Sequence, residues 1–148
     1  MDRFIYITPE QAKITHEKTI QYSGEGTLEE LDFGKLESVL YNIQNDDWYP
    51  TFVDKLTHLF FCTCQFHSFA DGNKRLAITL STLFLLLNGY LSIAETFLAK
   101  TENISLNVAA SKIDKELLHK IMEAIMNGSY DEDEALKLEI YNAINREL

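Results

Sequence analysis

A mostly apolar run, Leu76–Leu87, constrains the fold of this 148-residue chain more than any other feature of its sequence. The run is too short to cross a bilayer and includes two threonines and a serine, so we do not expect it to enter a membrane. It follows a polar loop directly and ends at Asn88-Gly89, a pair typical of the end of a helix. We therefore predict a buried central helix, around which the rest of the chain must pack.

The other segments also carry helix signals. Thr8-Pro9-Glu10-Gln11 combines an N-cap, a proline at the first helical position and a capping-box partner, so a helix should begin at Pro9 and end near residue 21. Thr51 with Asp54 predicts another helix start, and that helix should end near His67. Further helices are expected at residues 33–44, 114–127 and 131–147, with short helices or irregular structure at residues 90–113.

These signals predict an all-α fold, a single-domain helical bundle of residues 1–148 around the buried central helix. Strands are limited to at most a short β-hairpin near the Gly24–Leu31 turn. With 46% hydrophobic residues, the chain has enough apolar mass for one core. It shows no internal repeat, low-complexity tract or interdomain linker.

The two cysteines, Cys62 and Cys64, are two positions apart, where helical side chains point to different faces. They cannot form a disulfide framework, so we expect them to be reduced core residues of a cytoplasmic protein. A zinc site that adds His67 is not favoured, because the spacing fits no closed tetrahedral pattern. No secretory signal or membrane-spanning segment is evident, so we expect no membrane partner.

The charge of the chain bears on its partners. The net charge of −10 and the pI near 4.8 argue against nucleic acid, since phosphate backbones require clustered cations. The acidic run at residues 131–134 is interpreted as a solvated helix start, where carboxylates favour the helix dipole. It lacks the glycine turn of a calcium loop, so we expect no metal site there.

The stretch at residues 67–75 reads His-Ser-Phe-Ala-Asp-Gly-Asn-Lys-Arg and leads into the central helix. Gly72 permits a positive φ and lets backbone N–H groups converge on an anion. Asn73 is a good N-cap, and its amide could instead contact a phosphate. Lys74 and Arg75 lie in the first helical turn, where cations oppose the dipole unless an anion is bound. The pattern predicts a phosphate site at a helix N-terminus.

Three further residues of the stretch suit a reaction at that phosphate. Asp71 offers a hard oxygen ligand for Mg²⁺ held jointly with phosphates. His67 can accept a proton from a hydroxyl nucleophile, and Phe69 is expected to point inward and anchor the loop. Each residue alone also fits an ordinary turn. Their combination with two cations at a helix start favours a site that binds a metal–nucleotide and deprotonates an attacking hydroxyl.

The stretch resembles the signature of the Fic/Doc superfamily, His-x-Phe-x-(Asp/Glu)-(Gly/Ala)-Asn-(Gly/Lys)-Arg, and matches every specified position. The flanking segments are similar to the death-on-curing (Doc) branch, so that the resemblance spans about residues 4–127. The similar segments are Ile7-Thr8-Pro9-Glu10, His16, Tyr22-Ser23-Gly24 and the run from Leu83 to Tyr90. The resemblance implies an enzyme that uses ATP and Mg²⁺ to modify a protein hydroxyl.

Particular positions bear on which group such an enzyme would move. Superfamily members that transfer AMP typically carry Gly at the position of Lys74 and a second Arg at the position of Ile78. Doc carries Lys, lacks that Arg and phosphorylates a threonine of a translation elongation factor. The resemblance therefore implies phosphoryl transfer to Ser or Thr of a protein, although Gly72 departs from Doc and Ser68 from the common Fic pattern. AMP transfer and a catalytically silent anion- or peptide-binding module are the alternatives.

The resemblance also bears on regulation. Many Fic proteins block their own site with a helix that carries (Ser/Thr)-x-x-x-Glu-(Gly/Asn). The nearest match here, Gln21 to Gly26, lacks the hydroxyl residue, so we expect inhibition in trans by an antitoxin. The segment Tyr22–Phe33 corresponds best to the superfamily's flap, which pairs with a target peptide, and an ordinary surface loop is the alternative. His16 matches a histidine of the Doc pattern, but its local sequence assigns it no chemistry.

Overall fold

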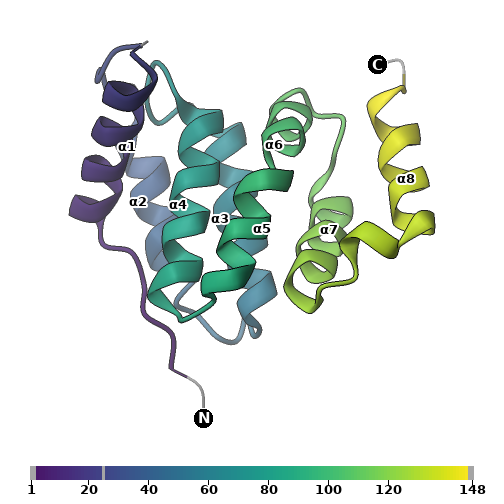
Figure 1. Cartoon of the computed structure of the whole chain (residues 1–148). Coiled ribbons are helices and arrows are strands. Elements are labelled where there is room, and N and C mark those ends of the chain that lie inside the picture. The colour runs from purple at the N-terminus through teal and green to yellow at the C-terminus, as the bar shows by residue number, and fades with distance from the viewer. Residues whose placement is uncertain (1–2, 25, 147–148) are drawn as a thin grey trace.

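The computed structural model describes residues 3–24 and 26–146. These residues form helices joined by loops, with no strand among them, as the sequence predicts (Figure 1). The elements are α1 Pro9–Ser23, α2 Phe33–Asn42, α3 Phe52–Gln65, α4 Asn73–Leu87, α5 Leu91–Lys100, α6 Glu102–Ala109, α7 Lys115–Asn127, the 3₁₀ turn η1 Tyr130–Glu132 and α8 Glu134–Ile144.

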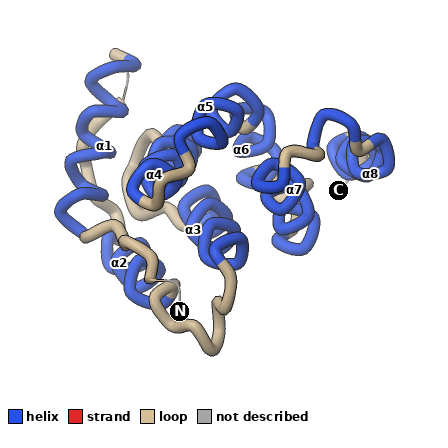
Figure 2. Tube along the Cα trace, turned by 60° about the horizontal axis from the view of Figure 1, so that its bottom comes forward, coloured by secondary structure: helices blue, strands red, loops and turns tan. Residues whose placement is uncertain are grey.

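The predicted central helix is α4, and it is buried. It packs against α1, α3, α5 and α6, and Figure 2 shows it between α1 on one side and α3 and α5 on the other. Leu76, Leu80 and Phe84 are spaced by one helical turn on its inner face and are fully buried. They belong to a hydrophobic core that extends from the N-terminal segment to α8. The apolar run is therefore the centre of the bundle.

Local capping decides where several helices begin and end. Thr8 and Thr51 each form a capping box with the residue three positions later, at the starts of α1 and α3. Asp114 accepts a hydrogen bond from the backbone of α7. Gly89 and Gly128 follow the ends of α4 and α7 with φ of +84° and +79°. These boundaries agree with the predicted ones because each depends on residues close by in the sequence.

The last helix starts later than predicted. The side chain of Asp133 accepts a hydrogen bond from the Leu136 N–H and caps α8, which therefore begins at Glu134 rather than at residue 131. Residues 130–132 form the separate 3₁₀ turn. The helix ends at Ile144, and the predicted end at residue 147 lies outside the described residues. Residues 90–113, for which the sequence predicts short helices or irregular structure, contain two short helices, α5 and α6.

The short β-hairpin that the sequence allows near Gly24–Leu31 does not form in the described part of that segment. Glu30 instead makes an isolated antiparallel bridge with Phe69 of the loop before α4. The hydrogen-bonding partner of this segment is therefore distant in the sequence. A turn signal alone could not identify it.

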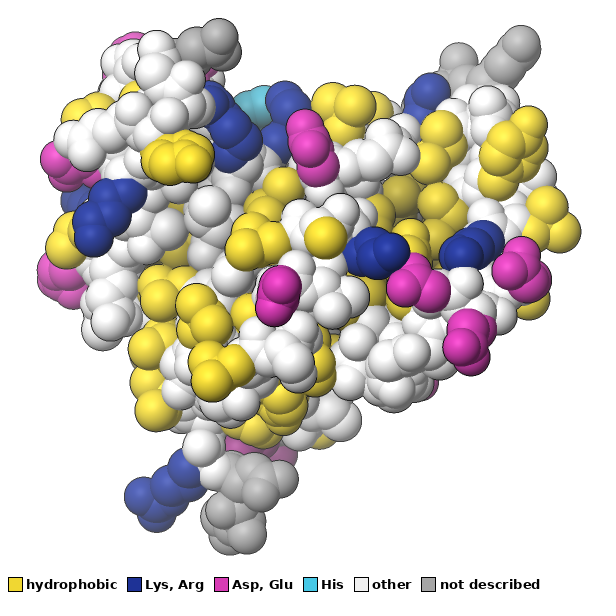
Figure 3. Space-filling view, viewed as in Figure 1, with side chains coloured by type: hydrophobic (Ala, Val, Ile, Leu, Met, Phe, Trp, Pro, Cys, Tyr) yellow, Lys and Arg dark blue, Asp and Glu magenta, His cyan; other side chains and the backbone are white. Residues whose placement is uncertain are grey.

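The loop before α4 lies at one edge of the molecule. In the space-filling view, Lys and Arg side chains and a histidine gather near the upper edge, over the region in which α4 begins (Figure 3). Within the residues that the structure describes, no helix is both long enough and apolar enough to cross a membrane.

Candidate active site

The motif His67–Arg75 forms the loop between α3 and α4 and the first turn of α4. His67 is exposed on this loop, whereas Phe69 is buried. The Phe69 ring packs against Phe33 at 5.7 Å between ring centroids. The loop is thus attached to the core in its middle, with polar residues on both sides of the attachment.

Gly72 makes the sharp entry into α4. Its φ is +84°, a value that residues with a side chain rarely adopt. A Cβ atom at this position would lie 2.9 Å from Cδ1 of Ile20, so the Ile20 side chain would have to shift to accommodate it. Both the backbone conformation and the packing on α1 therefore favour glycine.

The N-terminus of α4 is open. No side chain of the described residues caps it, and the first-turn N–H groups of Asn73, Lys74 and Arg75 donate to no acceptor there. The prediction that Asn73 is the N-cap is wrong, because Asn73 is already helical and follows Gly72. Its side chain turns back instead, donating to the Phe69 carbonyl at 2.8 Å and accepting from the Phe69 N–H at 3.3 Å. Asn73 thereby closes the loop and leaves the helix start free for an anion.

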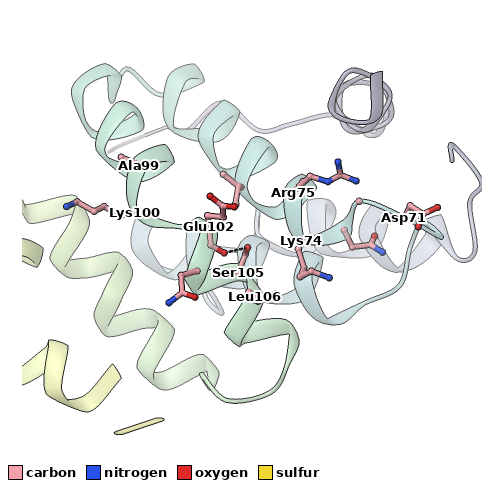
Figure 4. A pocket seen from close by; sticks show the side chains of 12 residues that line it. Asp71, Lys74, Arg75, Ala99, Lys100, Glu102, Ser105 and Leu106 are labelled. Atoms are coloured by element: carbon pink, nitrogen blue, oxygen red, sulfur yellow. Dashed lines mark hydrogen bonds between the residues drawn. The ribbon is translucent and has the colours of Figure 1, made fainter. Parts of the chain in front are cut away.

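A cleft of about 720 Å³ opens at this helix start. One wall is the motif from Asp71 to Arg75, and the opposite wall is the end of α5 and the start of α6 (Figure 4). Neither Lys74 nor Arg75 forms an ion pair with any described carboxylate, whereas Lys100 on the opposite wall pairs with Asp131 at 2.7 Å. Among the described residues, the cleft thus joins backbone N–H groups that lack an acceptor to two cations that lack a carboxylate partner.

The opposite wall was not identified from the sequence. It consists of Ala99, Lys100, Glu102, Asn103, Ser105 and Leu106. This segment carries no recognisable motif, and the packing of α5 and α6 on α4 brings it to the motif. Ile78, one turn after Lys74 and Arg75, also lines the cleft.

His67 does not line this cleft. It lies before Phe69 on the exposed part of the loop, whereas Asp71 and the residues up to Arg75 follow the buried ring. The structure therefore brings five of the predicted site residues together on one wall and places the predicted base on the same loop, outside the lining of the cleft.

A second segment runs along the outside of the motif loop. The N–H of Leu31 donates to the Ser68 carbonyl at 2.9 Å, antiparallel to the loop. Farther along, the N–H of Thr27 donates to Oδ2 of Asp71 at 3.1 Å. This segment is part of the predicted flap, and in the structure it orients the Asp71 carboxylate. Pairing of the flap with a target peptide stays a prediction.

Asp71 is the residue that the sequence predicts as a metal ligand. One of its oxygens accepts the Thr27 N–H, and the other has no hydrogen-bond partner among the described residues. No group of three or more histidine, cysteine or acidic side chains in the described ranges could hold a metal. A lone carboxylate fits Mg²⁺, which commonly binds through one or two carboxylates together with nucleotide phosphates and water. Asp71 therefore suits a metal that arrives with a nucleotide.

The two thiols near the motif contribute no nucleophile. Burial raises the pKa of Cys62 to about 11 and that of Cys64 to about 12. Both thiols are therefore protonated at neutral pH, and the thiolate is the reactive form. Both cysteines are free and buried in α3, which agrees with the predicted reduced core residues.

A sequence model of the Fic/DOC family matches residues 6–85, more than half of the chain. The chain belongs to the Fic/DOC family. The match covers the whole motif and agrees with the resemblance at the level of the superfamily, without distinguishing the Doc branch. Fic/DOC proteins are in general transferases that modify proteins with the help of nucleotide substrates and a metal. Searches of curated proteins and of solved structures each found no significant match. Helices α5 and α6, which form the opposite wall of the cleft, lie beyond the matched residues.

Proposed function

We propose that this Fic/DOC protein transfers the γ-phosphoryl group of ATP to a Ser or Thr hydroxyl of a protein target. The observation that carries the proposal is the open start of α4, where Lys74 and Arg75 have no carboxylate partner, and the first-turn N–H groups no acceptor, among the described residues. Cations in the first turn oppose the helix dipole, and a bound anion offsets that cost. A nucleotide polyphosphate matches both the charge of this wall and the size of the cleft.

Three residues bear on which group moves. Lys74 stands where AMP-transferring relatives typically have Gly, and Ile78 stands where they have a second Arg. The cleft therefore offers one guanidinium from α4. The Lys74 side chain takes up space at the helix start, which favours an orientation of the nucleotide different from that in AMP-transferring relatives. Gly72, which AMP-transferring relatives share, is explained by its φ and its approach to Ile20 and so does not favour AMP transfer.

His67 is the general base in this proposal. The target hydroxyl gives its proton to His67 while its oxygen attacks the γ-phosphorus in line. The new oxygen–phosphorus bond forms as the bond to the β–γ bridging oxygen breaks, and ADP leaves. Lys74, Arg75 and the free N–H groups stabilise the charge on the phosphate oxygens. Mg²⁺, held by Asp71 and the phosphates, would neutralise further phosphate charge.

We also propose that the protein is a toxin inhibited in trans by an antitoxin. A largely apolar groove of about 580 Å³ lies between α1 and α4 and is lined in part by Tyr22 and Leu83. Arg75 and Ile78 line both this groove and the cleft. A peptide or helix seated in the groove would therefore reach the phosphate site. The resemblance to Doc favours a cytoplasmic translation factor as the target.

The test follows the transfer of label from ATP to protein in a cell extract, with the label at either the γ- or the α-phosphate. Label from the γ position should appear on protein, and His67→Ala should abolish it. Arg75→Ala should lower transfer by about tenfold or more, because a guanidinium can hold two phosphate oxygens. Lys137→Ala removes an exposed cation of α8 and serves as the control with wild-type transfer.

Other outcomes of this experiment would contradict particular parts of the proposal. Label from the α position would establish AMP transfer instead, and no label from either position would favour a silent binding module. Full transfer by His67→Ala would remove the proposed base. The protein encoded by a neighbouring reading frame should suppress transfer if it is the antitoxin, and unchanged transfer would contradict that assignment.

A further inference from the structure

His16 links α1 to the motif loop, from which it is separated by 55 residues. Its side chain is buried, and Nε2 lies 2.8 Å from the backbone oxygen of Asp71. A carbonyl oxygen can only accept a hydrogen bond, so Nε2 carries the hydrogen and donates it. His16 therefore holds the main chain of the motif and not one of its side chains.

The ring of His16 has little freedom to move. It stacks on Phe69 with a centroid distance of 3.6 Å and an interplanar angle of 10°. Its Nε2 edge faces the next residue of the loop, since Nε2 would lie 3.6 Å from a Cβ atom built on Gly72. Because the ring is buried and stacked on Phe69, packing sets the direction of its hydrogen bond.

The hydrogen bond from His16 orients a whole peptide group. No peptide bond among the described residues is cis, and in a planar trans peptide the carbonyl and the N–H point in opposite directions. The Asp71 carbonyl points inward to His16, so the Gly72 N–H on the same peptide points away from the buried ring. Asp71 and Gly72 both line the cleft. The hydrogen bond from His16 therefore places Asp71, which carries the carboxylate, and the Gly72 N–H donor at the edge of the cleft.

We propose that His16 is a positioning residue of the phosphate site, which holds the Asp71–Gly72 peptide so that the Gly72 N–H and the Asp71 carboxylate face the bound nucleotide. The proposal rests on the proposed function, since it assigns His16 to the site that binds ATP. It explains why a polar ring is buried under the motif, where an apolar ring of similar size would fill the same space.

Two variants separate the hydrogen bond from the packing. His16→Phe keeps a buried ring against Phe69 but removes the donor. His16→Gln removes the ring but keeps an N–H donor that reaches about as far from the backbone. If His16 only fills space, His16→Phe should keep more of the wild-type ATP–Mg²⁺ affinity than His16→Gln. If His16 positions the peptide, His16→Gln should keep more of it.

The first measurement is calorimetric titration of ATP–Mg²⁺ into the full-length variants, with thermal unfolding to confirm that each is folded. His16→Phe should weaken ATP–Mg²⁺ binding by about tenfold, and His16→Gln should restore most of the lost affinity. Wild-type affinity in a folded His16→Phe variant, or equal losses in both variants, would overturn the role of His16. Absence of binding by the wild-type protein would instead overturn the proposed function.

The second measurement needs no nucleotide and applies even if one variant is unstable to heat. In a ¹⁵N–¹H correlation spectrum of the free protein, the Gly72 amide signal should move in His16→Phe and return toward its wild-type position in His16→Gln. The signals of Gly89 and Gly128, which end helices elsewhere, should stay in place in both variants. An unmoved Gly72 signal in His16→Phe would show that the hydrogen bond does not orient this peptide.

Discussion

Gly72 has a positive φ and lies close to a neighbouring side chain, whereas Gly89 has only the positive φ. Both residues have φ of +84°. Nothing lies within 4 Å of a Cβ atom built on Gly89, whereas one built on Gly72 would meet Ile20 at 2.9 Å. The pair therefore separates the cost of backbone conformation from the cost of packing on α1.

At this scale we expect Gly89→Ala to lower the free energy of unfolding by about 1 kcal/mol, the cost of a side chain in the left-handed region. Gly72→Ala should lower it by about 1 kcal/mol more, because Ile20 is buried and must shift. Urea unfolding of both variants measures the difference. Equal losses would mean that Ile20 moves aside at no cost and that conformation alone explains the glycine.

Between α3 and α7 lies a polar cluster that is separate from the cleft. Nζ of Lys115 donates to Nδ1 of His58 at 2.6 Å, so the neutral ring carries its hydrogen on Nε2, 3.1 Å from the Tyr49 hydroxyl. The Cys62 thiol approaches the same ring at 3.6 Å. Burial, and then the charge of Lys115, lower the pKa of His58 to about 4. His58 therefore links α3 to Lys115 of α7 as a neutral ring at neutral pH.

The lowered pKa predicts how stability depends on pH. In the unfolded chain this imidazole titrates near 6.5, so between about pH 6.5 and 4 the unfolded state binds a proton that the folded state does not. Acidification from pH 7.5 to 4.5 should therefore cost on the order of 2 kcal/mol of folding free energy through His58. His58→Gln keeps an acceptor for Lys115 but does not titrate, so its stability should fall less over this range. The same pH dependence in both proteins, measured by urea unfolding, would contradict this assignment.

For the whole molecule, we propose that the chain is a single domain. One hydrophobic core extends from Ile7 near the N-terminus, through Phe84 of α4, to Leu136 and Ile140 of α8. Helix α8 lies at the edge of the molecule (Figure 1) and packs on α7. Its buried residues nevertheless belong to the same core, so it should not unfold separately.

This continuity predicts one cooperative transition in urea. Far-ultraviolet circular dichroism reports all helices, whereas near-ultraviolet dichroism reports packed aromatic rings such as Phe52 and Phe84, whose centroids are 4.6 Å apart. The two signals should give the same midpoint and the same slope. An earlier midpoint for part of the helical signal would show that some helices, α8 first among them, form an independent unit.

The helices could be predicted because their limits depend on interactions between near neighbours. The caps at Thr8 and Thr51 need only a residue three positions later. The apolar composition of α4 is sufficient to predict a buried helix. The predicted start of α8 is too early because Asp131 and Asp133 both suit an N-cap. Only the 3₁₀ turn at residues 130–132 selects Asp133.

The motif wall of the cleft could also be predicted, because Asp71 to Arg75 are consecutive in the sequence. The other parts of the site required the folded chain. Burial of apolar surface packs α6 on α4 and so brings Glu102 opposite Arg75, although neither residue carries a signal for the other. His16 reaches Asp71 because α1 packs on α4, which no local pattern encodes. Hydrophobic burial is not directional, so contacts between distant segments follow from the packing of the whole core rather than from any short stretch of sequence.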